Sequence, residues 1–378
     1  MVKQRGKNGS VDIYLVYAVM LLLAVGIIMV YSASSYVDMI NHNGNSAYTF
    51  TRQLIFATLG CIAMYIMSRY DYHRLKNKRL VFILMIITVI LLFAVFLFPG
   101  VNGAKRWIML GPLSFQPSEL AKYVVVIYLA MALTNNMKNI TSFWKGIVPA
   151  LMMGGIFAAI ILSQKNLSIA SVTLIVTFIM LFVAGGRKKH LFGIVAPAML
   201  CAATTFTLIE PYRRARLLNF INPWKDAAGN GYQLIQSFYA LGAGGLTGLG
   251  LGQSRQKTLY MPEPHNDFIF AIIGEELGLV GCVVIIALFI FFIITGIRIA
   301  MRAKDNYGTL LAIGITSIIA IQAIINIAVV TGSMPVTGVP LPFISYGGSS
   351  LVVNLMAMGI LMNISRQIDK KPKKVLYK

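Results

Sequence analysis

The residues best suited to chemistry are acidic side chains at the start of a long apolar run. Asp267 begins this run, Glu275 and Glu276 follow within it, and Glu263 precedes it in the segment Tyr260–Phe270. The whole chain has only 12 Asp and Glu residues. An ionised acid costs roughly 2.5–3.5 kcal/mol at the middle of a bilayer and less near its surface. At least one of these acids is therefore expected to have a function.

Each acid also has a structural interpretation. Asp267 can cap the N-terminus of the following helix, where the helix dipole favours a negative charge. Glu275 lies about 12 Å further along that helix, at 1.5 Å per residue. Glu275 and Glu276 are expected to satisfy neighbouring helices rather than to act on a substrate.

A second cluster combines cations with an acid. Arg106 and Trp107 precede a predicted helix in which Pro117 suits the first turn, and Glu119 and Lys122 are neighbours on one helical face. Two interpretations stay open. In the first, the Glu–Lys pair neutralises itself inside the bundle and Arg106 is an interfacial anchor. In the second, Arg106 and Lys122 help to hold a diphosphate through charge-assisted hydrogen bonds.

The composition indicates which elements hold these side chains. Of 378 residues, 57% are hydrophobic and 12% charged, which is typical of a polytopic membrane protein. Apolar runs long enough to cross about 30 Å predict an all-α fold with about ten transmembrane helices. Their approximate cores are 12–31, 53–68, 79–98, 115–133, 146–163, 167–184, 190–209, 267–297, 308–331 and 343–364. The first is expected to be a retained helix, since its apolar run is long for a signal peptide.

The basic residues predict the orientation of these helices. An even number of spans puts both termini on one side, where 22 of the 33 Lys and Arg then fall, with 10 on the other side and Lys122 within a helix. The positive-inside rule makes that side cytoplasmic. The net charge of +21 is thus explained mainly by the basic residues that orient the helices in the membrane. No nucleic-acid partner is expected. We predict one membrane domain, 1–378, with a cytoplasmic tail 1–11, one large extracellular loop 210–266 between helices seven and eight, and a basic cytoplasmic tail 365–378.

Other kinds of site are weakly supported. A disulfide framework or zinc site is not expected from scattered histidines and from three cysteines that lie inside apolar runs, Cys61, Cys201 and Cys282. The Gly-rich stretch 242–252 lacks the ending of a P-loop and is expected to be a flexible loop. Residues Tyr232–Tyr239 predict a short amphipathic helix at the membrane surface. The hydroxyls before the last helix, among them Ser345, either pack or line a cavity.

Several short motifs occur in order along nearly the whole chain. They are Asn102-Gly103-Ala104…Arg106-Trp107-Ile108, Gln116-Pro117-Ser118-Glu119…Lys122, Asn222-Pro223-Trp224, Gly231-Tyr232-Gln233…Gln236-Ser237, Gly250-Leu251-Gly252-Gln253-Ser254, Pro262-Glu263…His265…Asp267-Phe268-Ile269-Phe270-Ala271, Glu275-Glu276-Leu277-Gly278 and Pro342-Phe343-Ile344-Ser345-Tyr346-Gly347-Gly348. Together they resemble the SEDS family (shape, elongation, division and sporulation). Asn363-Ile364-Ser365-Arg366 is more similar to its FtsW/SpoVE branch than to its RodA branch.

The resemblance implies a peptidoglycan glycosyltransferase of the bacterial cytoplasmic membrane, at the septum or forespore, that polymerises lipid II. It implies a class B penicillin-binding protein and other divisome or sporulation proteins as partners. The family's essential acid falls on Asp267, which we expect to be the catalytic base of an inverting transfer. Substrate contacts are expected from Arg106, Glu119, Lys122, Glu263, His265, Arg213, Arg255 and Ser345. A divalent cation, Mg²⁺ or Mn²⁺, is an optional helper, and no metal site built by the protein alone is expected.

One segment departs from the family pattern. The family commonly has Gln-Pro-Asp-Leu-Gly-Thr where this chain has Gln164-Lys165-Asn166-Leu167-Ser168-Ile169, so an acid is missing and a cation is added. No role of that family carboxylate can be transferred to this chain. Two other functions stay open, a lipid II flippase and a non-catalytic scaffold for septal or cortex wall synthesis.

Overall fold

The protein is a helical bundle, seen in a computed structural model that describes residues 9–100, 103–111, 113–209, 211–229, 231–258 and 260–368, without the side chains of 110, 113 and 211–213. Nine helices in these ranges are long and apolar enough to cross a membrane. Their α-helical parts are α1 (Ile13–Asn41), α2 (Tyr48–Arg69), α3 (Lys78–Ala94), α4 (Pro117–Asn135), α5 (Val148–Ser163), α8 (Ala196–Ile209), α11 (Ile269–Arg302), α12 (Asn306–Val330) and α13 (Gly348–Arg366). At the place of the remaining predicted span lies α6 (Leu167–Val183), an apolar helix of 17 residues. The prediction of an all-α polytopic membrane protein is confirmed.

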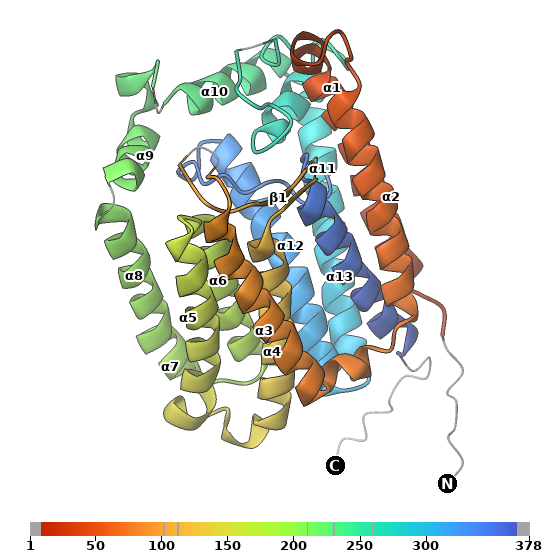
Figure 1. The fold of residues 1–378 in the computed structure, drawn as a ribbon, viewed down its shortest axis with the longest axis vertical. Helices are drawn as coiled ribbons and strands as arrows, with labels where there is room; N and C mark the ends of the chain where they lie inside the picture. Colours follow the sequence, from red (N-terminus) through yellow and green to blue (C-terminus); the bar gives the residue numbers. More distant parts are fainter. Residues whose placement is uncertain are drawn as a thin grey trace.

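Three helices form the centre of the bundle. In α4 and α13, 78% of the most apolar window is buried, and in α12 67%, against 6% in the span that ends with α8. α13 packs along α2, while α12 contacts α4, α6 and α11. Figure 1 shows α8 at one side of the bundle. The side chains of α4, α12 and α13 are therefore shielded, and those of α8 face outward.

α11 is broken near its start, where the sequence predicted one continuous span. Gly278 has a φ of 64°, a conformation that residues with a Cβ rarely adopt. The Gly-rich stretch supplies the missing helical hydrogen bonds, because Leu279 N donates to Gly245 O (2.9 Å) and Gly250 N donates to Glu276 O (3.0 Å). This stretch is therefore ordered against α11 and is not the flexible loop that its composition suggested.

The upper end of the bundle in Figure 1 carries short elements between the long helices. β1 (Ile108–Leu110) and β2 (Leu113–Phe115) form an antiparallel hairpin between α3 and α4, which the sequence did not predict. α9 (Pro211–Ile221) and α10 (Tyr232–Gly244) lie in the predicted large loop. The predicted amphipathic helix is confirmed in α10, which runs past Tyr239 to Gly244.

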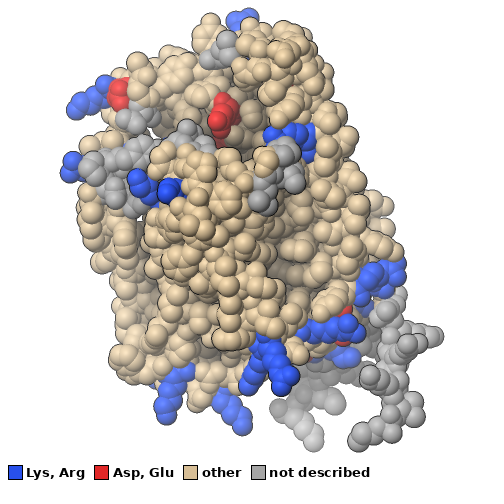
Figure 2. All heavy atoms as spheres, viewed as in Figure 1, with Lys and Arg blue, Asp and Glu red and all other residues tan. Residues whose placement is uncertain are grey.

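Charged side chains gather at the two ends of the bundle (Figure 2). The first and last described segments lie together at the lower end, where Gly9 N donates to Arg366 O (3.0 Å). On the face shown, this end carries many basic side chains, and the upper end carries acids between further cations. Both ends of the described chain thus lie on one side of the bundle, at the end that carries many basic side chains.

Candidate active site

The backbone of Asp267 is held by α12. Its carbonyl oxygen accepts from Asn326 Nδ2 (2.7 Å), and the same amide donates to Val339 O (2.7 Å). A Cβ added to Gly338 would lie 3.2 Å from Asp267 Oδ2, so the segment before α13 packs directly against the carboxylate. Asp267 is half-buried, and the N-cap of α11 is Phe268, without a side-chain capping bond. The structure therefore gives no support to the interpretation of Asp267 as a simple helix cap.

The surroundings of Asp267 oppose its ionisation. The pKa of Asp267 is raised to about 6, mainly by burial and also by the nearby Glu263 carboxylate, although the charges of Arg216 and Arg106 act to lower it. Glu263 is exposed, has a φ of 48° and accepts from Asn266 Nδ2 (2.7 Å). A carboxyl group with this pKa is mostly ionised at pH 7 and still basic enough to take a proton.

The two arginines reach Asp267 from different parts of the chain. Arg216 lies on α9, and its Nη1 donates to Val336 O (3.1 Å), two residues before the glycine that faces Asp267. Arg106 precedes β1, and its Nη2 donates to Lys165 O (2.5 Å). Asp267 thus lies in an environment with two guanidinium groups, which recognise phosphate through charge-assisted hydrogen bonds.

The segment that departs from the family pattern lies beside this site. Lys165, whose carbonyl accepts from Arg106, has a φ of 61°. The Asn166 side chain caps α6 by accepting a hydrogen bond from Ile169 N (3.3 Å). It also donates a hydrogen bond to Ser118 Oγ (3.4 Å). The Ser168 hydroxyl donates to Thr337 O. An amide therefore replaces the family's acid at the cap, a position that both residue types favour.

Glu119 and Lys122 are paired inside the bundle. Their side chains are 1% and 0% exposed, and Lys122 Nζ lies 2.7 Å from Glu119 Oε2 and 2.8 Å from Gln322 Oε1. The pair thus links α4 to α12. Of the two interpretations of this spacing, the geometry favours a self-neutralised structural pair.

Glu275 and Glu276 anchor the loop that precedes α11. Glu275 accepts from the Ser254 hydroxyl and from Arg255 N (2.9 Å). Glu276 accepts from Lys257 Nζ (2.8 Å) and from Ser32 Oγ of α1 (2.6 and 2.7 Å to its two oxygens). These contacts agree with the expectation that both acids satisfy neighbouring segments.

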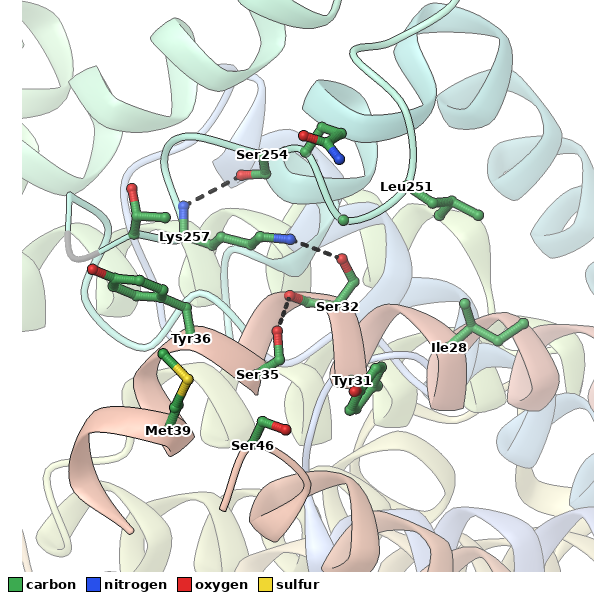
Figure 3. A pocket seen from close by; sticks show the side chains of 13 residues that line it. Ile28, Tyr31, Ser32, Ser35, Tyr36, Met39, Ser46, Leu251, Ser254 and Lys257 are labelled. Atoms are coloured by element: carbon green, nitrogen blue, oxygen red, sulfur yellow. Dashed lines mark hydrogen bonds between the residues drawn. The ribbon is translucent and has the colours of Figure 1, made fainter. Parts of the chain in front are cut away.

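The same contacts form one wall of a pocket of about 620 Å³ between α1 and the loop 251–258 (Figure 3). In the close-up, Lys257 reaches from the loop towards Ser32, and Ser254 lies above them. The ammonium group of Lys257 is already bonded to Ser32 Oγ (3.2 Å) and Glu276. Asp267 does not line this pocket.

His265 and Ser345 also lie near the start of α11. Burial lowers the pKa of His265, partly offset by the charges of Glu263 and Asp38, so the imidazole is mainly neutral at pH 7. Its ring lies 5.6 Å from the Tyr346 ring, and its carbonyl accepts from Tyr346 N (2.9 Å). Ser345 is buried, and its hydroxyl accepts from Leu341 N (2.8 Å), which indicates a role in shaping this turn.

Two further positions, Arg213 and Arg255, were predicted to contact substrate. The side chain of Arg213 lies outside the described residues. Arg255 is exposed and its backbone is bound by Glu275, whereas among the described side chains the arginine charges that act on Asp267 come from Arg106 and Arg216. Sequence reasoning did not select Arg216. Its spacing of three from Arg213 on a helix was a usable signal, because such residues share a face.

A divalent cation would depend on few protein ligands. Among the described residues, no group of three or more His, Cys, Asp and Glu side chains is arranged to hold a metal ion. Mg²⁺ often binds through one or two carboxylates together with substrate phosphates. Asp267 and the neighbouring Glu263 provide carboxylates of that kind.

Comparison with known families gives a match over most of the chain. The family model for FtsW, RodA and SpoVE, described as "Cell cycle protein", matches residues 13–370. "Stage V sporulation protein E" of Bacillus subtilis is 47% identical over 367 residues, covering 95% of this chain and 98% of the relative. "Probable peptidoglycan glycosyltransferase FtsW" of Geobacter metallireducens is 40% identical, covering 96% of each.

Solved structures show the same fold. One, described as "Structural coordination of polymerization and crosslinking by a peptidoglycan synthase complex", contains a chain with a TM-score of 0.78 and 30% identity, covering 94% of this chain and 98% of that one. The rod shape determining protein RodA of Thermus thermophilus gives a TM-score of 0.71 at 26% identity, covering 96% of this chain and 98% of that one.

Proposed function

Since the chain belongs to the FtsW/RodA/SpoVE family, we propose that it is a peptidoglycan glycosyltransferase that polymerises lipid II into β-1,4-linked glycan strands. The observation that carries this proposal is the half-buried carboxylate of Asp267, with a pKa of about 6, in the field of Arg106 and Arg216. A base and two cations in one place match the needs of a transfer that expels a diphosphate.

Asp267 acts as the general base. It takes the proton from the 4-hydroxyl of the acceptor's N-acetylglucosamine while that oxygen bonds to the anomeric carbon of the donor's N-acetylmuramic acid. The bond from this carbon to the diphosphate breaks, and undecaprenyl diphosphate leaves with the electron pair. Attack opposite the leaving group inverts the anomeric carbon. A positioned base contributes typically 10²–10⁴-fold to such a rate.

Arg106 and Arg216 stabilise the departing diphosphate. Guanidinium groups bind phosphate oxygens through short, charge-assisted hydrogen bonds, and their charge is fixed before the reaction begins. Glu263 raises the pKa of Asp267 and so tunes its basicity. The neutral His265 helps to form the binding site for the acceptor sugar. A divalent cation held by Asp267, Glu263 and the substrate would add further charge stabilisation when bound.

The charge distribution supports an outer-face reaction. The end of the bundle that holds Gly9 and Arg366 is assigned to the cytoplasm because 22 of the 33 basic residues belong to that side. Asp267 then faces the exterior of the bacterial cytoplasmic membrane. The relative named for sporulation favours a septal or forespore location, and the likeness to a chain of a peptidoglycan synthase complex favours a class B penicillin-binding protein as partner.

One assay tests this function. Purified protein with its partner is given labelled lipid II, and glycan strands are resolved on a gel. We expect polymer from the wild type and from Asp71→Asn, an exposed acid at the other end of the bundle, but none from Asp267→Asn. Lipid scrambling in vesicles without polymer would favour a flippase. Absence of both activities would favour a scaffold.

A further inference from the structure

A second pocket lies at the opposite end of the bundle from Asp267. It has a volume of about 350 Å³ and is formed where the start of α1 meets the ends of α2 and α13. Arg298, far along α11 from Asp267, contacts Asp12 at the start of α1 (2.8 Å), which fixes the position of this end. The volume falls within the range of small-ligand sites. The proposed glycosyl transfer does not use this pocket.

The deeper wall of the pocket is apolar. Val11 and Val16 belong to the start of α1, and Met64 and Met362 come from α2 and α13. α2 and α13 touch backbone to backbone here, since a Cβ on Gly359 would lie 2.3 Å from Met64 O. This wall follows the helices towards the middle of the bundle and suits a hydrocarbon chain.

The mouth of the pocket is positively charged. Arg69 is exposed, with its guanidinium carbon 5.1 Å from the centroid of the Tyr65 ring, and Arg366 Nη1 donates to Ser68 O (3.2 Å). Neither arginine belongs to the ion pairs formed by the described residues. The pocket therefore holds two cations whose positions are fixed by neutral neighbours.

We propose that this pocket binds an anionic phospholipid, with the phosphate at Arg69 and Arg366 and an acyl chain along Val16 and Met64. Guanidinium groups suit phosphate oxygens, and the exposed Tyr65 is of a type enriched at membrane interfaces. Basic pockets between helix ends on the cytoplasmic side are typical sites for acidic lipid headgroups. A bound lipid bridges α1, α2 and α13. Free inorganic phosphate would engage only the mouth and leave the apolar wall uncovered.

Native mass spectrometry and thermal unfolding of the full chain test the proposal. The protein is placed in nanodiscs of phosphatidylcholine with or without phosphatidylglycerol, and in phosphatidylcholine with inorganic phosphate. We expect retained phosphatidylglycerol and a higher Tm for the wild type. Affinity for this lipid should fall about fivefold for each arginine removed in Arg69→Gln and in Arg69→Gln/Arg366→Gln.

Arg74→Gln is the matched control, because Arg74 also stacks over a tyrosine (5.6 Å from the Tyr70 ring) but lies outside the pocket. It should bind phosphatidylglycerol as the wild type does. The single Arg69→Gln change is on an exposed side chain, so its Tm in phosphatidylcholine should equal that of the wild type. The proposal is overturned if both arginine variants retain phosphatidylglycerol, if phosphatidylcholine binds equally well, or if inorganic phosphate alone gives the full stabilisation.

Discussion

Replacing Lys122 with Met leaves the Glu119 carboxylate buried without its cation. The two side chains are 0% and 1% exposed, and Nζ lies 2.7 Å from the carboxylate, so water cannot take over the role of the ammonium group. Removing one member of a buried ion pair costs roughly 3–5 kcal/mol. The free energy of unfolding should fall by that amount, a large share of a typical total of about 5–15 kcal/mol.

The double variant Glu119→Gln/Lys122→Met separates a structural role from substrate binding. A neutral amide at position 119 needs no counter-charge and can bond to Gln322, whose Oε1 now accepts from Lys122 (2.8 Å). Replacing both members of a buried pair with neutral groups is often close to neutral for stability. We therefore expect most of the lost stability to return, and polymerisation to return with it.

The assay combines SDS titration, which gives the free energy of unfolding, with lipid II polymerisation by the same preparation. Lys145→Met, at an exposed position outside the buried pair, is the control and should change stability by no more than about 0.5 kcal/mol. A double variant that is as stable as the wild type but makes no polymer would refute the structural assignment and place Lys122 in contact with substrate.

Three further outcomes are expected. Because the base must be ionised and the pKa of Asp267 is about 6, polymerisation should fall about tenfold per pH unit below that value and level off above roughly pH 7; a flat profile from pH 5 to 8 would contradict this. Gly278→Ala should lower the free energy of unfolding by at least about 1–3 kcal/mol in SDS titration, because its φ is 64° and the new Cβ would lie 2.4 Å from Gly248 N. Asn326→Leu leaves the carbonyls of Asp267 and Val339 without their amide donor, so the polymerisation rate should drop even where the protein remains folded, and an unchanged rate would argue against this support.

The sequence predicted the helices and the acidic residues at the start of α11 because both can be recognised from the local sequence pattern. A long apolar run needs only its own residues to be recognised, and an acid beside it is visible at once. The pairing of Glu119 with Lys122 was likewise visible from their spacing of three. Their partner Gln322 lies 200 residues from Lys122 along the chain, and no local pattern connects them.

Features that depend on contacts between distant segments could not be predicted. Gly278 is one glycine in an apolar run, and its left-handed conformation is stabilised by the Gly-rich stretch that docks on it. The choice of Arg216 over Arg255 near Asp267 depends on the position of α9, from which the Arg216 side chain reaches Val336. Arg216 and Arg255 are both arginines in the predicted extracellular loop, so only the tertiary structure distinguishes them.

Three consecutive residues before α13 connect the elements of the site. Val336 O accepts from Arg216, Thr337 O accepts from Ser168, and Gly338 packs against the carboxylate of Asp267. The family pattern commonly has a glycine where this chain has Ser168, and a glycine cannot donate this hydrogen bond. The departure at residues 164–169 therefore removes an acid from the site and adds a tether between α6 and the segment that supports the base. The altered segment can thus influence the position of Asp267 through Thr337 and Gly338.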